Sequence, residues 1–174
     1  MFRKFKILSF LVILITFLSC SKLIFKRKIF FKIYPPFKDF LQYQSIMGEV
    51  ETEDFIFNFE TQKLKDGLFK LNFWDIFLSK SFVIDIEKYK RSYPFLYCLY
   101  KWSAGETQPI IRRCEKFLYL YFKDFNYQIL VFFDGKFFTY FTTQETLKVD
   151  VYSKKIYYSN GKEWVWISLK NLRK

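Results

Sequence analysis

The stretch DFIFNFETQ, residues 54–62, decides the fold class, because its hydrophobic residues recur at every second position. Phe55, Phe57 and Phe59 fall on one side of an extended chain, and mostly polar residues fall on the other. A period of two is typical of a half-buried strand, whereas a helix repeats every three to four residues. The same alternation recurs in SFVIDIEKY (81–89), LKVDVY (147–152) and EWVWISL (163–169). We therefore predict a mainly β (α+β) fold.

Hairpin signals separate these strands. Asx-Gly dipeptides tolerate the positive φ angles of type I′ turns, whose twist matches the flanking strands. Three of them stand between strand-like runs: Asp66-Gly67, Asp134-Gly135 and Asn160-Gly161. We expect a strongly twisted antiparallel sheet or half-open barrel of roughly eight to ten strands, with one or two short helices.

The segments outside these hairpins are harder to interpret. Pro36 at the start of PFKDFLQYQ (36–44) predicts a short helix. YPFLYCLYKW (93–102) alternates well enough to be a strand, and SAGETQPIIRRCEKF (103–117) reads as a loop because of its glycine and proline.

The first nineteen residues have the organisation of a signal peptide. Three basic residues precede an apolar run over 7–18, which is shorter than the ~20 residues that a bilayer crossing needs. The residues FLSC (17–20) then resemble a bacterial lipobox, in which a small residue precedes the cysteine that is acylated. The resemblance implies cleavage after Ser19 and a lipid anchor on Cys20. An uncleaved anchor and an ordinary N-terminal helix are the alternatives.

This N-terminus predicts three parts: a signal peptide (1–19), a basic and apolar tether on the membrane (20–35) and a single antiparallel β-domain (36–174). The alternative for 20–35 is a first strand or helix of the domain. We expect a location in the cell envelope, lipid-anchored and facing the periplasm. Ser21 after the cysteine favours the outer membrane over the inner one by analogy with acylated proteins.

The net charge of +12 would suit a nucleic-acid partner, but an exported protein does not meet one. Basic residues near anionic headgroups, or lysines that solubilise an apolar chain, explain the charge instead. Once Cys20 is assigned to the anchor, Cys98 and Cys114 remain, and an oxidising envelope compartment permits a disulfide between them. Two buried thiols that never meet are the alternative.

Catalytic and metal-binding patterns do not emerge from the sequence. It contains no histidine, which is the commonest general base and metal ligand near neutral pH. A strand would place Glu49, Glu51 and Glu53 on one face, where a weak cation site competes with a simple solvated surface. We predict no catalytic residues, no metal and no cofactor, and therefore a protein that is not an enzyme.

Aromatic residues make up 24% of the chain, more than an ordinary core of this size requires. A half-closed barrel with an apolar ligand cavity would use them, and a two-sided packed sheet is the alternative. The candidate lining residues, chosen by alternation, are Phe57, Phe59, Phe73, Phe82, Ile84, Leu130 and Phe132.

The order of segments resembles the Lol family of envelope proteins, which comprises the periplasmic lipoprotein carrier and its outer-membrane lipoprotein receptor. The resemblance rests on the lipobox-like signal, FLQYQSIMGEVETEDFIFNFE (40–60) with its lone glycine, FKLNFWDIFLSKSFVIDI (69–86) and EWVWISL (163–169). It implies a half-open barrel that holds acyl chains. It also implies a membrane-contacting loop, which would include Trp74, Ile76 and Phe77.

These expectations combine into one leading hypothesis. It is an acylated envelope lipoprotein that binds an acyl chain, a lipoprotein or another apolar ligand without chemistry, with lipoprotein or lipid transfer to the outer membrane as the expected role. A structural or interaction lipoprotein within an envelope complex is the second hypothesis. A bitopic anchor with a periplasmic β-domain of the lipopolysaccharide-export type is the third.

Overall fold

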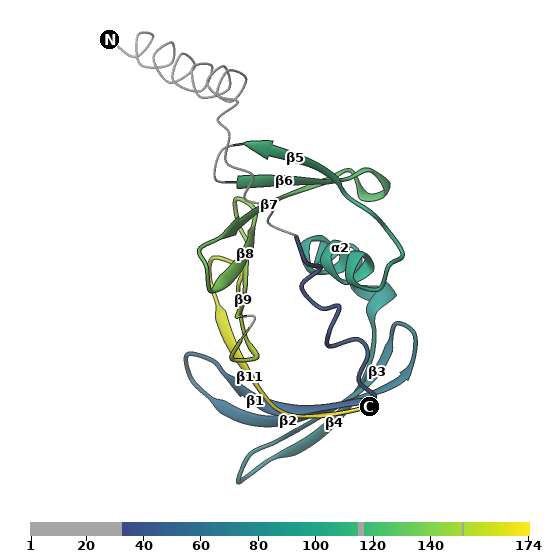
Figure 1. Cartoon of the computed structure of the whole chain (residues 1–174). Helices are drawn as coiled ribbons and strands as arrows, with labels where there is room; N and C mark the ends of the chain where they lie inside the picture. Colours follow the sequence, from purple (N-terminus) through teal and green to yellow (C-terminus); the bar gives the residue numbers. More distant parts are fainter. Residues whose placement is uncertain (1–32, 115–116, 151) are drawn as a thin grey trace, which may run out of the picture. The chain divides into compact units, whose positions relative to one another are not determined.

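The computed structural model describes residues 33–114, 117–150 and 152–174, and Tyr34–Lys174 form one compact unit (Figure 1). The predictions for the signal peptide (1–19), for Cys20 and for most of the tether (20–35) lie outside the described residues. In the described part of the chain, no helix has both the length and the apolar composition that a membrane crossing requires.

The unit is built mainly of strands. They are β1 (Ser45–Glu51), β2 (Ile56–Lys65), β3 (Leu68–Trp74), β4 (Ser79–Asp85), β5 (Ile110–Cys114), β6 (Phe117–Phe122), β7 (Tyr127–Phe133), β8 (Phe137–Phe141), β9 (Thr146–Asp150), β10 (Lys155–Ser159) and β11 (Trp164–Arg173). Between them lie the α-helix α2 (Pro94–Ser103) and the short 3-10 helices η1 (Ile86–Tyr89) and η2 (Lys123–Phe125).

All eleven strands belong to one sheet in the order β4-β3-β2-β1-β11-β10-β9-β8-β7-β6-β5, and every pairing is antiparallel. The N-terminal meander β1–β4 meets the C-terminal meander β5–β11 where β1 pairs with β11. Strands β4 and β5 form the two edges and do not pair with each other, so the sheet is not closed. The prediction of a mainly β, antiparallel fold is confirmed.

Helix α2 lies against one face of the sheet, which we call the inner face. The ring of Trp102 on α2 lies 6.1 Å from that of Phe122 (β6) and 6.5 Å from that of Tyr140 (β8). At the other end of the sheet, Tyr100 on α2 makes an edge contact with Phe69 (β3) at 6.3 Å. Figure 1 shows the strands of this unit curving around α2. We call the opposite face the outer face.

The packed core lies between α2 and the C-terminal meander. Phe95, Cys98 and Leu99 on α2 are fully buried. They share this core with inner-face side chains of β6–β10: Leu120, Phe122, Ile129, Val131, Tyr140, Leu147, Val149 and Ile156. Each fully buried aliphatic or aromatic side chain contributes about 1.5–3 kcal/mol relative to exposure, so this half of the sheet carries most of the hydrophobic stabilisation.

Three local predictions are wrong. Residues 93–102 form most of α2 and no strand, because Pro94 stands at the first helical turn, where its missing N–H is not needed. Residues 36–42 make hydrogen-bonded turns in place of a helix, with Phe40 N–H donating to the carbonyl of Phe37. The expected loop 103–117 contains β5, which pairs with β6.

The three predicted hairpins are confirmed, because β2–β3, β7–β8 and β10–β11 are adjacent pairs that turn at the Asx-Gly dipeptides. At the second of them, Gly135 has φ +99°, a conformation that favours glycine. The carboxylate of Asp134 accepts hydrogen bonds from the N–H groups of Lys136 and Phe137 at 2.9 and 2.7 Å. These backbone donors lower the pKa of Asp134.

Candidate functional site

A cavity of about 590 Å³ lies on the inner face of the N-terminal meander. The strands β1–β4, β10 and β11 supply one wall, and α2, η1 and the turn after Pro36 supply the other. The lining is overwhelmingly apolar, and its aliphatic and phenylalanine members are Phe37, Phe40, Leu41, Ile46, Phe59, Phe69, Ile84, Ile86, Leu96, Ile156, Ile167 and Leu169. The volume falls within the ~300–1,000 Å³ range of small-molecule pockets.

This half of the sheet is hollow because α2 packs mainly on the other half. In the described residues of β1–β4, Phe59 is the only hydrophobic side chain that is as buried as a core residue, with 5% of its surface exposed. Its neighbours on the inner face, such as Phe57, Phe69 and Phe73, are only partly buried. The apolar surface on this half of the inner face is therefore partly accessible to solvent.

Two residues that line this cavity, Lys63 and Tyr97, pair with acidic residues beside it. Lys63 forms an ion pair with Asp66 at 2.7 Å, and the Tyr97 hydroxyl donates to Glu87 at 2.7 Å. Lys101 bridges Glu87 and Glu106 with ion pairs of 2.6 and 2.5 Å.

The hydrogen bonds among these residues shift the pKa values of Tyr97 and Glu87. Burial and the hydrogen bond to Glu87 raise the pKa of Tyr97 to about 12, so this hydroxyl stays neutral at physiological pH. The hydrogen bonds from Lys101 and Tyr97 lower the pKa of Glu87. The cavity thus presents a mostly apolar surface, and Lys63, paired with Asp66, is the one charged residue of its lining.

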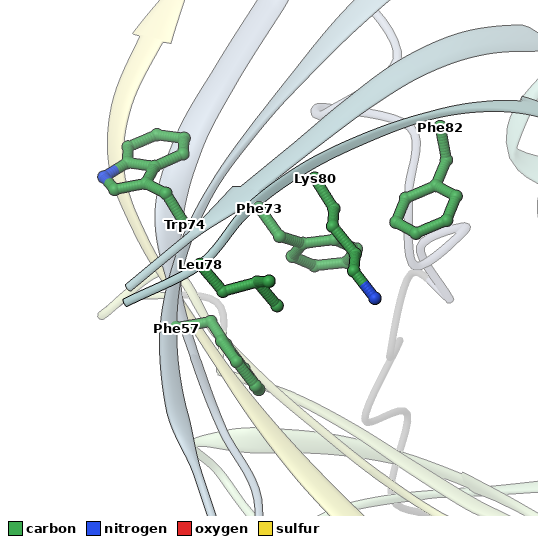
Figure 2. Close-up of a pocket in the computed structure, with 6 residues that line it drawn as sticks. All are labelled: Phe57, Phe73, Trp74, Leu78, Lys80 and Phe82. Carbon is green, nitrogen blue, oxygen red and sulfur yellow. The ribbon is translucent and has the colours of Figure 1, made fainter. Parts of the chain in front are cut away.

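A second, smaller pocket of about 220 Å³ continues the inner face toward the β3–β4 turn. Its lining consists of Phe57, Phe73, Trp74, Leu78, Lys80 and Phe82 (Figure 2). In Figure 2 the side chains of Phe57, Phe73, Leu78, Lys80 and Phe82 point toward one space, while Trp74 points away from it. The alternation along β3 explains this, since Phe73 faces inward and Trp74 outward.

The two cavities share a continuous apolar wall. Phe59, which lines the larger cavity, lies directly opposite Phe73 of the smaller pocket in the β2–β3 register. The ring of Phe73 lies 6.4 Å from that of Phe57 and 6.2 Å from that of Phe82. The linings of the two cavities therefore adjoin each other on the inner face of the sheet.

The turn beyond the smaller pocket displays two large apolar side chains to solvent. Ile76 and Phe77 have 87% and 89% of their surface exposed. The carboxylate of Asp75 accepts hydrogen bonds from the N–H groups of Phe77 and Leu78, both at 2.6 Å, and holds the turn. The neighbouring β1–β2 turn exposes Phe55 and Ile56 at the same end of the sheet.

The structure brings together most of the residues that alternation had selected. Phe59 and Ile84 line the larger cavity, and Phe57, Phe73 and Phe82 line the smaller pocket.

The two exceptions are Leu130 and Phe132, which lie on the outer face, so their prediction is wrong. Their neighbours Ile129 and Val131 are the residues of β7 that face the core, and the Phe132 ring contacts Phe117 at 5.8 Å. Strand β7 is apolar on both faces, so alternation alone did not indicate which face is inward.

The far wall of the cavity was missed entirely. Leu96, Tyr97 and Tyr100 reach the cavity because residues 94–103 are helical, and the sequence interpretation had made this segment a strand. The signal that would have found it is the Tyr93-Pro94 step, which is typical of a helix start.

The predicted Cys98–Cys114 disulfide is also wrong. Cys98 is a free thiol with none of its surface exposed, and it points into the core from α2. Burial raises its pKa to about 12. Of the acidic residues considered for a cation site, Glu49 forms an ion pair with Lys170 at 2.8 Å. In the described ranges, no three Cys, Asp or Glu side chains cluster as a metal site would need.

The geometry is therefore that of an apolar cavity beside a smaller apolar pocket. No known protein family, no curated protein and no solved structure matches this chain.

Proposed function

We propose that this protein is a membrane-anchored envelope lipoprotein that binds an acyl chain, as a free lipid or as part of a lipoprotein, in the cavity between β1–β4 and α2. The observation that carries the proposal is the continuous apolar wall of the two adjoining cavities, which ends beside an exposed apolar turn. The resemblance to the Lol family, with its strongly twisted, half-open barrel and acyl-chain cavity, supports the same function.

The driving force would be the transfer of apolar surface out of water. Each methylene group of an acyl chain that enters the cavity contributes about 0.8 kcal/mol. Binding would need little rearrangement, because the cavity walls are set by the sheet and by α2. No covalent chemistry is required, and the protein would act as a carrier or receptor, with no enzymatic role.

Membrane contact would come from two places. The acylated Cys20 and the basic tether would hold the protein on a membrane, preferably the outer membrane with the β-domain in the periplasm. The exposed Ile76 and Phe77 would enter the lipid surface beside the smaller pocket. Trp74 lies at the base of the same turn, at a position suited to an interfacial aromatic residue.

Photocrosslinking tests the proposed site. The full chain in phosphatidylcholine nanodiscs is exposed to a fatty acid with a diazirine near its tail, and the crosslinked residues are identified by mass spectrometry. We expect crosslinks on the inner face, at residues near Phe59 and Ile84.

Thr61→Trp, which fills the larger cavity, should reduce these crosslinks at least tenfold. Thr139→Trp is the matched control, because Thr139 lies on the outer face opposite Phe132. Equal crosslinking in both variants, or crosslinks spread over the outer face, would exclude the cavity as the binding site.

The edge strand β5 favours a second candidate function, that of an interaction lipoprotein. Ile110 and Ile111 are each 49% exposed, and Arg112 and Arg113 beside them are exposed as well. An extended segment of a partner, preferably acidic, would add to this edge. Slower hydrogen exchange of the β5 amides inside the intact envelope than in the purified protein would support this candidate. The lipopolysaccharide-export type of bitopic domain stays a further alternative.

A further inference from the structure

We infer that the ligand of this cavity is an anionic amphiphile, and that Lys80 binds its carboxylate or phosphate head while the acyl tail lies in the adjoining cavities. The inference rests on the proposed function and adds the chemical class of the ligand and the residue that selects it.

Lys80 is the one cationic member of the smaller pocket. It lies on the inner face of β4, directly opposite Phe73 in the β3–β4 register. Figure 2 shows its side chain extending past the ring of Phe73, and Lys80 is an exposed residue of the pocket lining. A lysine in this position would bury its methylene stem against the rings and present its ammonium group at the pocket mouth.

Within the described residues, Lys80 has no ion-pair partner, and the pocket lining contains no carboxylate. The cationic residue in the larger cavity differs, because Lys63 is already neutralised by Asp66 at 2.7 Å. Lys80 is an exposed residue, and an exposed ammonium group binds an anion only weakly unless the anion also brings an apolar part that the pocket holds. An acyl chain with a terminal anion satisfies both halves of the pocket.

The geometry also sets the direction in which the ligand lies. Lys80 is close to the exposed β3–β4 turn, and the apolar wall runs from it through Phe73 to Phe59 and the larger cavity. The head would therefore stay near the membrane-facing mouth, and the tail would point toward α2. A neutral amphiphile of equal length would fill the same cavity and leave Lys80 without a counterion.

The test compares ligands that each contain sixteen carbon atoms and carry different heads, as competitors of the diazirine probe on the full chain in phosphatidylcholine nanodiscs. Palmitate and hexadecyl phosphate carry the two anionic heads, and hexadecanol is neutral. In the wild-type protein we expect the better anion to displace the probe at a concentration about 2–5-fold lower than hexadecanol, the ratio that an exposed ion pair provides. The order of the two anions identifies the head as carboxylate or phosphate.

Substitutions of Lys80 test whether this residue causes the preference for anions over hexadecanol. Lys80→Gln should bring the anions to the level of hexadecanol while hexadecanol itself stays unchanged, and Lys80→Arg should keep the preference. Lys70→Gln is the control, because Lys70 lies on the outer face of the same hairpin, opposite Val83. Thermal unfolding of each variant confirms that the domain remains folded.

Two results would overturn the inference and leave the proposed function intact. One is equal displacement by all three ligands in the wild type, and the other is an anion preference that survives Lys80→Gln. If none of the ligands displaces the probe from the inner face, the proposed function itself fails.

Discussion

The ring of Phe59 lies directly over Gly48 of the neighbouring strand, at a position where a side chain on residue 48 would have to stand. The two residues are paired in the β1–β2 register, and a Cβ atom at Gly48 would come within 2.7 Å of Cε1 of Phe59. The same atom would also collide with the carbonyl oxygen of Ser168 in β11. Glycine at this position thus lets the wall of the cavity close around Phe59.

Gly48→Ala should therefore destabilise the protein by about 1–3 kcal/mol, the usual cost of forcing extra volume into a packed site. Denaturant unfolding measures this loss. The double variant Gly48→Ala with Phe59→Leu gives the ring more room, so its loss should be smaller than the sum of the two single losses. Strict additivity of the two changes would mean that the clash with the backbone carbonyl of Ser168, and not the one with the Phe59 ring, causes the loss.

The exposed turn should control the rate of ligand uptake and not the amount bound. Replacing both Ile76 and Phe77 by serine removes apolar surface that inserts into lipid, at about 1.5–3 kcal/mol for each side chain. We expect transfer of a fluorescent fatty acid from vesicles to the full chain to slow at least tenfold, with unchanged saturation.

Tyr152→Ser serves as the control for this pair, since Tyr152 is 78% exposed near the opposite end of the strands. An equal slowing in this control would show a general surface effect.

Cys98 should be chemically silent in the folded protein. Its thiol is fully buried and its pKa is raised to about 12, so the reactive thiolate is scarce at pH 8. We expect N-ethylmaleimide to leave Cys98 unmodified under native conditions and to modify it within minutes in guanidinium chloride. Peptide mass spectrometry separates it from the other cysteines. Rapid native labelling would place Cys98 outside the core.

Asp150 should make stability depend on acid. Its side chain is 2% exposed, and although burial raises the pKa, hydrogen bonds from Ser153 and from the Tyr152 N–H outweigh this effect and lower the pKa to about 2. A carboxylate with a depressed pKa stabilises the fold above its unfolded pKa and loses this contribution as the pH falls through the folded value.

Asp150→Asn should therefore cost about 2 kcal/mol at pH 7, the worth of a buried charged hydrogen bond. The difference from the wild type should shrink as the pH falls from 4 toward 2. Urea unfolding at several pH values measures it. A difference that does not change with pH would show that the charge of Asp150 plays no part.

The sequence predicted strands well where one face is polar and poorly where both are apolar. DFIFNFETQ alternates clearly, and Phe57 and Phe59 face the cavities as expected. In β7 the alternation is between apolar residues only, so the pairing of Val131 with Tyr140, and not any local pattern, decides which face is inward.

Helix α2 could not be recognised from the sequence because it is apolar on more than one side. Leu96, Tyr97 and Tyr100 line the cavity, and Phe95, Cys98 and Leu99 enter the core. A helix that is apolar around most of its circumference has no clear period. The cavity depends on where this helix packs, and that is a property of the tertiary structure.

The pairing of β1 with β11 has a consequence for when the site comes into existence. Each meander pairs strands that are neighbours in the sequence. The β1–β11 pairing instead joins residues far apart in the sequence, such as Glu49 and Lys170, whose carboxylate and ammonium groups lie 2.8 Å apart. Contacts so distant in sequence form slowly, because a long loop must close first. Until β1 pairs with β11, Ile167 and Leu169 of β11 cannot join Phe59 in lining the larger cavity. We therefore expect the wall of the cavity to be completed in a late stage of folding.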